Sequence, residues 1–236
     1  MRKEDNLVST AYGQEAAKQY DTRRFTTEQG LLFARFELDE LERVIARVPQ
    51  GADLLEVGCG TGRFSLYLGN CGYRVRAVDP SSDMIAIASE KCVGLDNVTF
   101  AQEEAASLSS ADSTFDLVFS IRVTNQTESE AYALRMIKEM IRVTKPEGLV
   151  LVEFVNSQRP FHKKSKNVRL SFSQITEVAS EANCRVESRR GILVFSQTIL
   201  NRIPKVLVPV WALVERISSR ILWKWASRGY ILLRKQ

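Results

Sequence analysis

Short apolar runs alternate with stretches of helical periodicity along this chain. Five runs have the length and the Val, Leu, Ile or Phe content of buried strands: residues 54–57, 74–78, 98–101, 115–120 and 149–154. Helical patterns lie between most of them, and residues 31–48 carry one apolar stripe before the first. Because strands that alternate with helices pair mainly in parallel, the pattern predicts an α/β fold built on a parallel sheet.

The first apolar run leads directly into three glycines, Gly58, Gly60 and Gly62, and then into a helical pattern. Glycine is required where the chain turns sharply or where a ligand touches the backbone. The helix that follows adds unpaired N–H groups and a positive dipole end. Such a turn binds nucleotide-like ligands, but its G-x-G-x-G spacing differs from the dinucleotide G-x-G-x-x-G, because Arg63 stands in the place of the third glycine.

Asp79 ends the second predicted strand, about 20 residues after the first glycine. A carboxylate at this place can accept hydrogen bonds from two ribose hydroxyls. The alternative is that Asp79 and Pro80 only help to cap the next helix, for which Ser81 and Ser82 are also suited.

The stretch Glu56–Gly62, Glu-Val-Gly-Cys-Gly-Thr-Gly, resembles the first motif of class I S-adenosylmethionine (SAM) methyltransferases. Further segments over residues 52–155 resemble the family in the same order, although Glu147 replaces a usual glycine. The resemblance implies SAM as cofactor. It also implies a Rossmann-like, seven-stranded, mostly parallel sheet with an antiparallel last strand, helices on both faces, and residues 184–188 and 229–233 as the last two strands.

The resemblance assigns cofactor contacts to the glycine turn, to the ends of the next three strands and to an N-terminal segment. The predicted cofactor-binding residues are Tyr20, Arg24, Glu56, Gly58, Cys59, Gly60, Thr61, Gly62, Asp79, Pro80, Met84, Glu104, Ala105 and Ser120. Glu104 would accept from the adenine amino group, although Glu103 could take that role. Tyr20 and Arg24 could meet the cofactor's carboxylate or lie in a surface loop, and Met84 could be helix core instead.

Arg122, Thr124 and Asn125 follow the fourth strand, and the topology brings them towards the methyl acceptor. His162 is the candidate general base, and a solvated loop histidine is the alternative. Residues 120–123 read Ser-Ile-Arg-Val, without the Asn/Asp-Pro-Pro-Tyr tetrapeptide of base-amino methyltransferases, which argues against nucleobase amines as acceptors. With a single histidine and no evident carboxylate cluster, no metal site is predicted.

Length and composition predict one domain over residues 1–236, since 236 residues with 44% hydrophobic content can bury one sizeable core. Within it we expect an N-terminal helical lid over residues 1–51, the SAM-binding core over 52–155 and a C-terminal part over 156–236. The four cysteines form no C-x-x-C pair, and the charged start lacks a signal peptide. These features predict a reduced, cytoplasmic protein.

Charge divides the chain unevenly. Residues 1–157 hold 17 Lys and Arg against 24 Asp and Glu, a net charge of −7, whereas residues 158–236 hold 16 against 4, a net charge of +12. Such asymmetry indicates an anionic partner: a membrane surface, a nucleic acid or an acidic substrate.

A basic helical insertion is expected over residues 189–228, between the last two strands and above the acceptor site. Its apolar residues recur at helical spacing, and all three tryptophans lie in it: Ile203, Val206, Leu207, Val210, Leu213, Val214, Ile217 and Ile221, with Trp211, Trp223 and Trp225. The pattern favours a lid whose apolar stripe packs on its own domain. Peripheral membrane contact through residues 201–226 is the alternative, and a nucleic-acid surface is a weaker one.

These observations predict a SAM-dependent methyltransferase of the small-molecule branch, in which quinone-biosynthesis methyltransferases are found. The expected acceptor is a small, amphiphilic or anionic molecule, methylated on oxygen rather than on nitrogen or carbon. Two alternatives remain open. One is an RNA or protein methyltransferase that uses the basic face, and the other is a regulatory protein that binds SAM without transferring its methyl group. The sequence makes no prediction of the oligomeric state.

Overall fold

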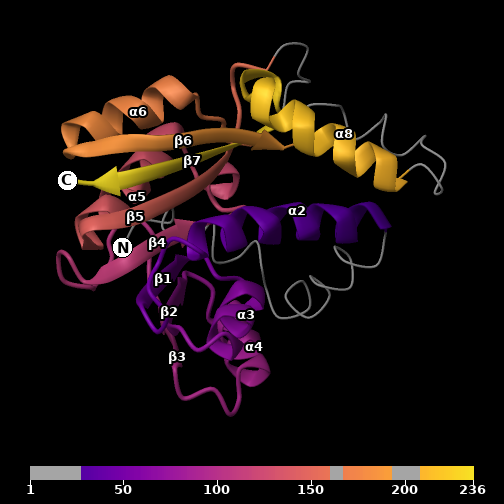
Figure 1. Cartoon of the computed structure of the whole chain (residues 1–236). Helices are drawn as coiled ribbons and strands as arrows, with labels where there is room; N and C mark the ends of the chain where they lie inside the picture. The colour runs from indigo at the N-terminus through magenta and orange to yellow at the C-terminus, as the bar shows by residue number, and fades with distance from the viewer. Residues whose placement is uncertain (1–27, 160–166, 193–207) are drawn as a thin grey trace.

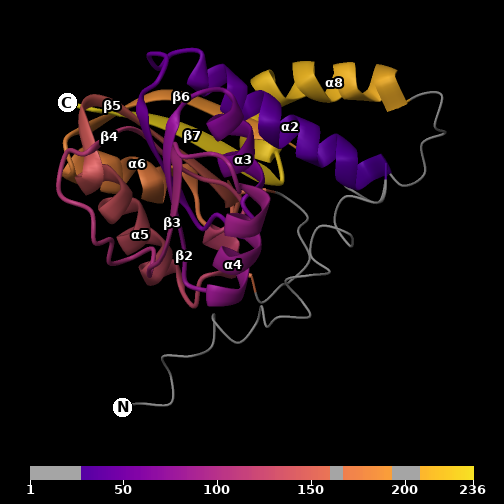
Figure 2. The ribbon, with the colours of Figure 1, turned by 90° about the horizontal axis from the view of Figure 1, so that it is seen from below.

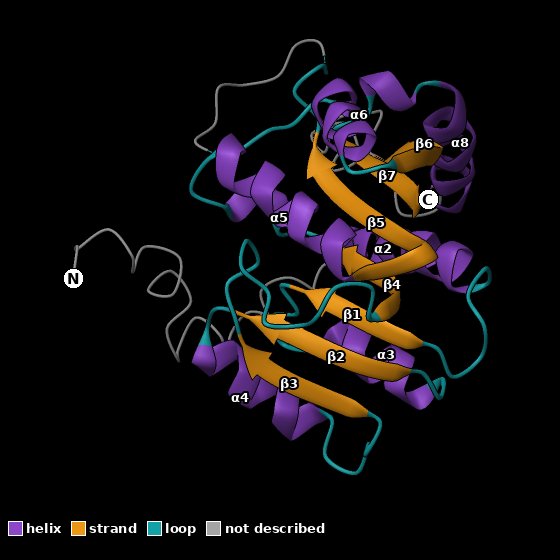
Figure 3. Ribbon diagram, turned by 90° about the vertical axis from the view of Figure 1, so that its left-hand side faces the viewer, coloured by secondary structure: helices purple, strands orange, loops and turns teal. Residues whose placement is uncertain are grey.

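A single mixed sheet organises the computed structural model, which describes residues 28–159, 167–192 and 208–236 (Figure 1). Seven strands of the described chain lie in the order β3-β2-β1-β4-β5-β7-β6 (Figure 3). Their bounds are β1 Asp53–Val57, β2 Arg74–Asp79, β3 Val98–Gln102, β4 Phe115–Ser120, β5 Thr144–Val155, β6 Cys184–Ile192 and β7 Arg228–Lys235. The strands β1 to β5 pair in parallel, and β7 runs antiparallel to both β5 and β6. The predicted fold class is therefore confirmed.

Helices cover both faces of this sheet. The described helices are α2 Glu28–Ile45, α3 Arg63–Asn70, α4 Ser82–Lys91, α5 Glu130–Val143, α6 Phe172–Glu181 and α8 Val208–Ile221, with short 3-10 helices η2 Thr124–Gln126 and η4 Trp223–Trp225. Helices α2, α3 and α4 lie on one face, and α5 and α6 on the other (Figure 3). From β1 the chain adds β2 and β3 on one side of the sheet and then continues with β4 on the other side. Open α/β sheets bind ligands at such a switch point, at the carboxyl ends of the strands.

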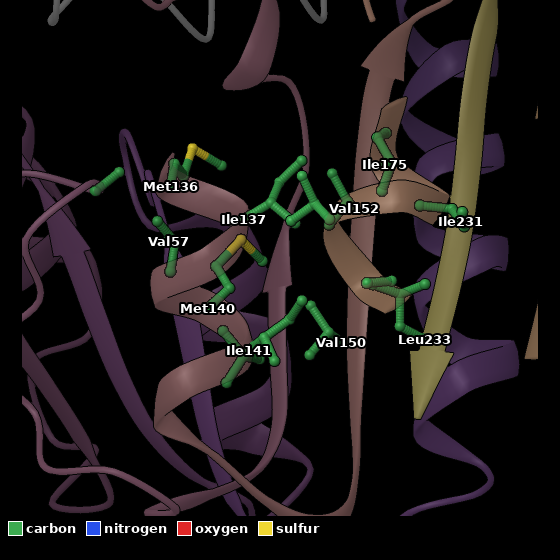
Figure 4. Packing of buried hydrophobic residues seen from close by; sticks show 14 of the residues in the cluster. Val57, Met136, Ile137, Met140, Ile141, Val150, Val152, Ile175, Ile231 and Leu233 are labelled. Atoms are coloured by element: carbon green, nitrogen blue, oxygen red, sulfur yellow. The ribbon is translucent and has the colours of Figure 1, made fainter. Parts of the chain in front are cut away.

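The core is built from helix stripes that face the sheet. On α5, Met136, Ile137, Met140 and Ile141 recur at helical spacing, are at most 2% exposed and pack with the apolar face of β5 and β7 (Figure 4). On the other face, apolar residues of α2 and α3 form a second cluster with the sheet. Burial of each large apolar side chain stabilises the fold by about 1.5–3 kcal/mol. The two clusters therefore fix the positions of the strands and of their carboxyl ends.

The sixth strand is longer than predicted, because it extends to Ile192 rather than ending at residue 188. Its added residues include Arg189 and Arg190, which the sequence analysis assigns to the start of the basic helical insertion. They are tolerated since β6 is the edge strand, and Arg190 donates to the Glu40 carboxylate of α2 at 2.8 Å. Helix α2 begins three residues before its predicted start and ends three residues before its predicted end.

The preferred interpretation of the insertion, a lid whose apolar stripe packs inward, is wrong for α8. Five apolar residues on one side of the helix are exposed by 38–73% of their surface: Val210, Leu213, Val214, Ile217 and Ile221. The side turned towards the body carries Trp211, packed against the core, and Glu215, only 1% exposed. Hydrophobic periodicity located the helix and its stripe but did not fix which side packs inward. Residues 193–207 of the insertion lie outside the described residues.

Candidate functional site

The glycine turn joins β1 to α3 and has one side open. Gly58, Gly60 and Gly62 all have positive φ, between 53° and 78°. A Cβ on Gly58 would lie 2.3 Å from the Val123 Cγ2 atom, and one on Gly62 would lie 2.8 Å from the Ala88 Cβ. At Gly60 a Cβ would meet nothing within 4 Å. Two glycines therefore permit close packing, and the middle one presents bare backbone where a ligand can approach.

Asp79 holds this turn from the end of β2. Its Oδ2 accepts from the Gly60 N–H at 2.9 Å, and its Oδ1 accepts from the Ser81 N–H at 2.9 Å. The Ser81 hydroxyl caps α4 by accepting from the Met84 N–H at 3.3 Å, so the capping role falls to Ser81. Each oxygen of Asp79 keeps a second lone pair. Burial raises the pKa of Asp79, and the nearby Glu104 charge adds to the effect.

The two glutamates after β3 have separate partners. Glu103 accepts from Arg76 at 2.5 Å and from the Ser109 hydroxyl at 2.7 Å. Glu104 is exposed and accepts from the Tyr132 hydroxyl at 2.6 Å. Glu103 is therefore held by an ion pair with Arg76 and by Ser109, whereas Glu104 accepts from a single hydroxyl and keeps more acceptor capacity. Of their neighbours, Ala105 and Met84 are buried and Pro80 is partly buried.

Glu56 and Cys59 lie beneath the turn. Glu56 is 3% exposed and accepts from the Ser65 hydroxyl at 2.5 Å. Burial raises the pKa of Glu56 to about 8, so its carboxyl group holds a proton at neutral pH. Burial also raises the pKa of the Cys59 thiol, which leaves it a neutral thiol rather than a nucleophile. Thr61 is buried as well.

Stability should fall as pH rises from about 5 to 8, because folded Glu56 keeps a proton that the unfolded chain releases near its ordinary value of 4.5. Replacement of Glu56 by glutamine, which keeps an oxygen for the Ser65 hydroxyl, should flatten this dependence. Thermal melts at pH 5 and pH 8 measure it, with Glu128→Gln, on a half-exposed side chain, as the control. An unchanged difference between the two melting temperatures in Glu56→Gln would contradict the assignment.

The residues after β4 lie against the end of β5. Arg122 has a φ of 71°, in the left-handed region, and its N–H donates to the Glu153 Oε2 at 2.7 Å. The Thr124 hydroxyl donates to the Glu153 carbonyl at 3.0 Å, and the buried Ser120 hydroxyl donates to the Val57 carbonyl at 2.9 Å. The side-chain oxygen of Asn125 is buried and has no hydrogen-bond partner among the described residues. A bound polar group could satisfy that oxygen, so Asn125 stays a candidate for acceptor binding.

A charge cluster that the sequence analysis missed lies at the same edge of the sheet, under α2. Its members are Glu37, Arg63, Arg122, Glu153 and Arg228. Glu37, 1% exposed, pairs with Arg63 at 2.6 Å and with Arg122 at 3.7 Å. Glu153, fully buried, pairs with Arg228. The available signal was Glu153 itself, a lone charge inside the apolar run of residues 149–154, which marks a buried carboxylate with a partner.

Tyr230 lies beside this cluster, opposite Glu153 in the β5–β7 pairing. Its side chain is 1% exposed, and its hydroxyl has no hydrogen-bond partner among the described residues. Burial and the Glu153 and Glu37 charges raise the pKa of Tyr230, so the group stays a neutral hydroxyl that can donate. Three predicted site residues, Tyr20, Arg24 and His162, lie outside the described residues.

Comparisons with known proteins give the glycine turn its context. Residues 54–148 match the family described as a methyltransferase domain. Over 120 residues the chain is 32% identical to a malonyl-[acyl-carrier protein] O-methyltransferase of Pectobacterium atrosepticum, covering 50% of this chain and 45% of that protein. Over 157 residues it is 32% identical to a ubiquinone/menaquinone biosynthesis C-methyltransferase of Klebsiella pneumoniae, covering 62% and 58%. The chain thus spans about half the length of the curated relatives it matches.

Solved structures share the fold. A magnesium protoporphyrin IX methyltransferase from Synechocystis, with bound SAM, superposes with a TM-score of 0.70 at 12% identity, covering 100% of this chain and 99% of that one. A [4+2]-cyclase superposes with a TM-score of 0.61 at 21% identity, covering 84% and 80%. At such identities the likeness concerns the fold alone. The cyclase shows that this fold also occurs in a protein named for another reaction, so function has to be argued from the site.

Proposed function

We propose that this chain, whose residues 54–148 match the methyltransferase-domain family, transfers the methyl group of SAM to a small acceptor. The match of residues 54–148 to this family supports the enzyme class that the sequence predicted, and the SAM bound in a solved structure of the same fold supports the cofactor. The observation that carries the proposal is the open backbone of Gly60 between the Asp79 carboxylate and the close-packed Gly58 and Gly62. SAM is a nucleoside with a ribose diol and a sulfonium-linked amino-acid tail. The Asp79 carboxylate can accept hydrogen bonds from the diol, and the open backbone at Gly60 lets the ligand approach closely.

Each residue of the turn has a proposed task. Asp79 accepts from the ribose hydroxyls through the lone pairs that Gly60 and Ser81 leave unused. Glu104 accepts from the adenine amino group, Ala105 donates its N–H to the ring, and Met84 and Pro80 bound the site. Four buried residues support the conformation of the turn from the interior: Glu56, Cys59, Thr61 and Ser120. Tyr20 and Arg24 are proposed to meet the cofactor's carboxylate.

When bound, SAM supplies a methyl group that its sulfonium already activates. The protein's task is then to align the acceptor and to exclude water, and such orientation contributes about 7–11 kcal/mol. We assign the acceptor side to Arg122 and Asn125, with Thr124 holding their loop to β5. A hydroxyl acceptor has to lose a proton, for which His162 is the proposed base, whereas an ionised carboxylate has none to lose.

The proposed acceptor is amphiphilic or anionic, and oxygen is the atom methylated. Among the described residues, the charge cluster holds three arginines, Arg122 included, against two glutamates, which suits an anionic group. Methylation on oxygen is supported by two relatives, which are named as a malonyl-[acyl-carrier protein] O-methyltransferase and a ubiquinone biosynthesis O-methyltransferase. We also include peripheral contact of residues 201–226 with a membrane in this proposal.

Calorimetry tests the cofactor first. SAM and its demethylated product should both bind, and NAD should not, because the turn lacks the dinucleotide spacing. Methyl-labelled SAM should then label a prenylated hydroquinone or a malonyl thioester on oxygen, as read by mass spectrometry and NMR. NAD binding without SAM binding would overturn the proposal. SAM binding with no transfer to either probe, or to RNA or protein, would support the regulatory alternative.

A further inference from the structure

Helix α8 presents its most apolar side to solvent. Val210, Leu213, Val214, Ile217 and Ile221, here called the outward stripe, are exposed by 60%, 59%, 38%, 53% and 73%. They recur at intervals of three and four residues and so form one continuous row along the helix. Helices α8 and α2 both extend beyond the sheet on the same side of the molecule (Figures 1 and 2). Scattered exposed apolar residues are ordinary, but a continuous row marks a surface that binds something.

The opposite side of α8 shows that the helix is held in this orientation. Trp211 packs with the cluster of α2, α3 and the sheet, and Glu215 is buried to 1% exposure. At its end the insertion is fastened by Asn156, which is 1% exposed and whose side-chain amide donates to the carbonyls of Lys224 at 2.9 Å and Ala226 at 3.1 Å. The helix therefore buries a carboxylate and partly buries a tryptophan, while five aliphatic side chains face outward.

We propose that the outward stripe rests on an anionic lipid surface. The surrounding sequence is strongly basic, with five Lys and Arg against one Glu in residues 201–226 and a net charge of +12 over residues 158–236. Lys224 and Trp225 follow the helix and are exposed, Trp225 by 58%. An aliphatic row within a basic segment, followed by an exposed lysine and an exposed tryptophan, is the composition of a helix that lies in a membrane interface.

Other occupants fit this surface less well. A second copy would bring two segments of the same positive charge together. RNA binding favours aromatic side chains among basic ones, whereas the stripe is aliphatic. An acidic protein would complement the positive charge, but its charged surface would not cover the apolar outward stripe. None of the described helices is long and apolar enough to cross a bilayer, so the proposed contact is with the surface.

This inference deepens the proposed function by placing its acceptor at a membrane. Asn156 directly follows β5, at the edge of the sheet where Arg122 and Asn125 lie. Because Asn156 fastens the insertion there, a protein resting on the stripe keeps its proposed acceptor side at a fixed position relative to the lipid. A lipid-linked acceptor could then reach the site without leaving the bilayer.

Vesicle flotation of the full chain tests the proposal. We expect binding to phosphatidylcholine vesicles that contain phosphatidylglycerol, weaker binding to phosphatidylcholine alone, and a reduction at high salt for the anionic vesicles. The double variant Leu213→Gln/Ile217→Gln should bind the anionic vesicles about tenfold or more weakly, since each change removes a large aliphatic side chain from the interface. The matched control is Val93→Gln, at an apolar residue 82% exposed elsewhere, which should bind like the parent.

Four results would overturn the proposal. They are the absence of binding to any vesicle, binding that the double variant leaves unchanged, a dimer in sedimentation that the double variant dissociates, and a melting temperature several degrees lower in the double variant. The last would show that the stripe is covered by the chain itself. SAM affinity, measured by calorimetry, should be the same in all three proteins. A negative result in vesicle flotation therefore refutes the membrane contact, whereas absence of SAM binding in calorimetry refutes the proposed function.

Discussion

Replacement of Asp79 by alanine is expected to weaken SAM binding by about 1–3 kcal/mol, which is about five- to 150-fold. Two contributions add up. The ribose hydroxyls lose the acceptors proposed for them, and the Gly60 and Ser81 N–H groups lose the oxygens that hold the turn at 2.9 Å. Calorimetric titration of the variant with SAM measures the loss, and a thermal melt shows whether the fold survives.

Asp79→Asn removes only part of each contribution. Asparagine keeps the shape and one carbonyl oxygen, but its amide nitrogen cannot accept a hydrogen bond, so either the Gly60 or the Ser81 N–H loses its acceptor. We expect this variant to melt between the parent and Asp79→Ala, and to bind SAM more weakly than the parent. The control is Asp96→Ala, at an exposed aspartate before β3, at the opposite edge of the sheet. If both Asp79 variants fold and bind SAM as tightly as the parent, the proposed ribose contact is wrong.

Replacement of Glu153 by glutamine should lower the free energy of unfolding by about 3–5 kcal/mol, because it leaves the Arg228 guanidinium buried without its counter-charge. Glu153 is fully buried and the Arg228 side chain is 13% exposed, so water screens this pair little. Glutamine keeps a side-chain oxygen for the Arg122 N–H, which limits the change to the charge. Chemical denaturation measures the loss.

The double variant Glu153→Gln/Arg228→Met should recover most of that stability, since a buried pair replaced on both sides leaves no uncompensated charge. The matched control is Glu181→Gln, which breaks the Lys138–Glu181 pair at 2.8 Å, where both side chains are more than half exposed. It should change the free energy of unfolding by no more than about 0.5 kcal/mol. A single variant as stable as the parent, or a double variant less stable than the single one, would show that Arg228 does not depend on Glu153.

The glycine turn and the first five strands could be predicted because their signals are local, whereas the seven-stranded topology with an antiparallel last strand was implied by the family resemblance. Each of the first five strands is an apolar run, and glycines at 58, 60 and 62 leave few conformations other than a tight turn. The helix cap at Ser81 and the acidic end of β2 at Asp79 are local in the same sense. These features depend on neighbours within a few residues, so the amino-acid sequence is almost enough to locate them.

The charge cluster could not be predicted in the same way, because its partners are distant in sequence. Glu37 in α2 meets Arg63, and Glu153 in β5 meets Arg228 only after the sheet is assembled. Helix α8 illustrates a related limit. Its periodicity separates two sides, but the packing of Trp211 and Glu215 on the body decides which side is buried. Periodicity measures contrast between the faces of a helix and contains no information on what covers either face.

The position of β7 has a consequence for the order in which this molecule can be made. The strand lies between β5 and β6 and pairs with both, so residues 184–192 have no strand partner until residues 228–235 have left the ribosome. The five parallel strands can assemble earlier, from contacts already synthesised. Until the last strand inserts, the edge of β5 presents unpaired backbone groups that can pair with another chain. Its insertion closes a loop of long sequence separation, which is a slow kind of step, so the chain is most prone to aggregate before β7 has paired with β5 and β6.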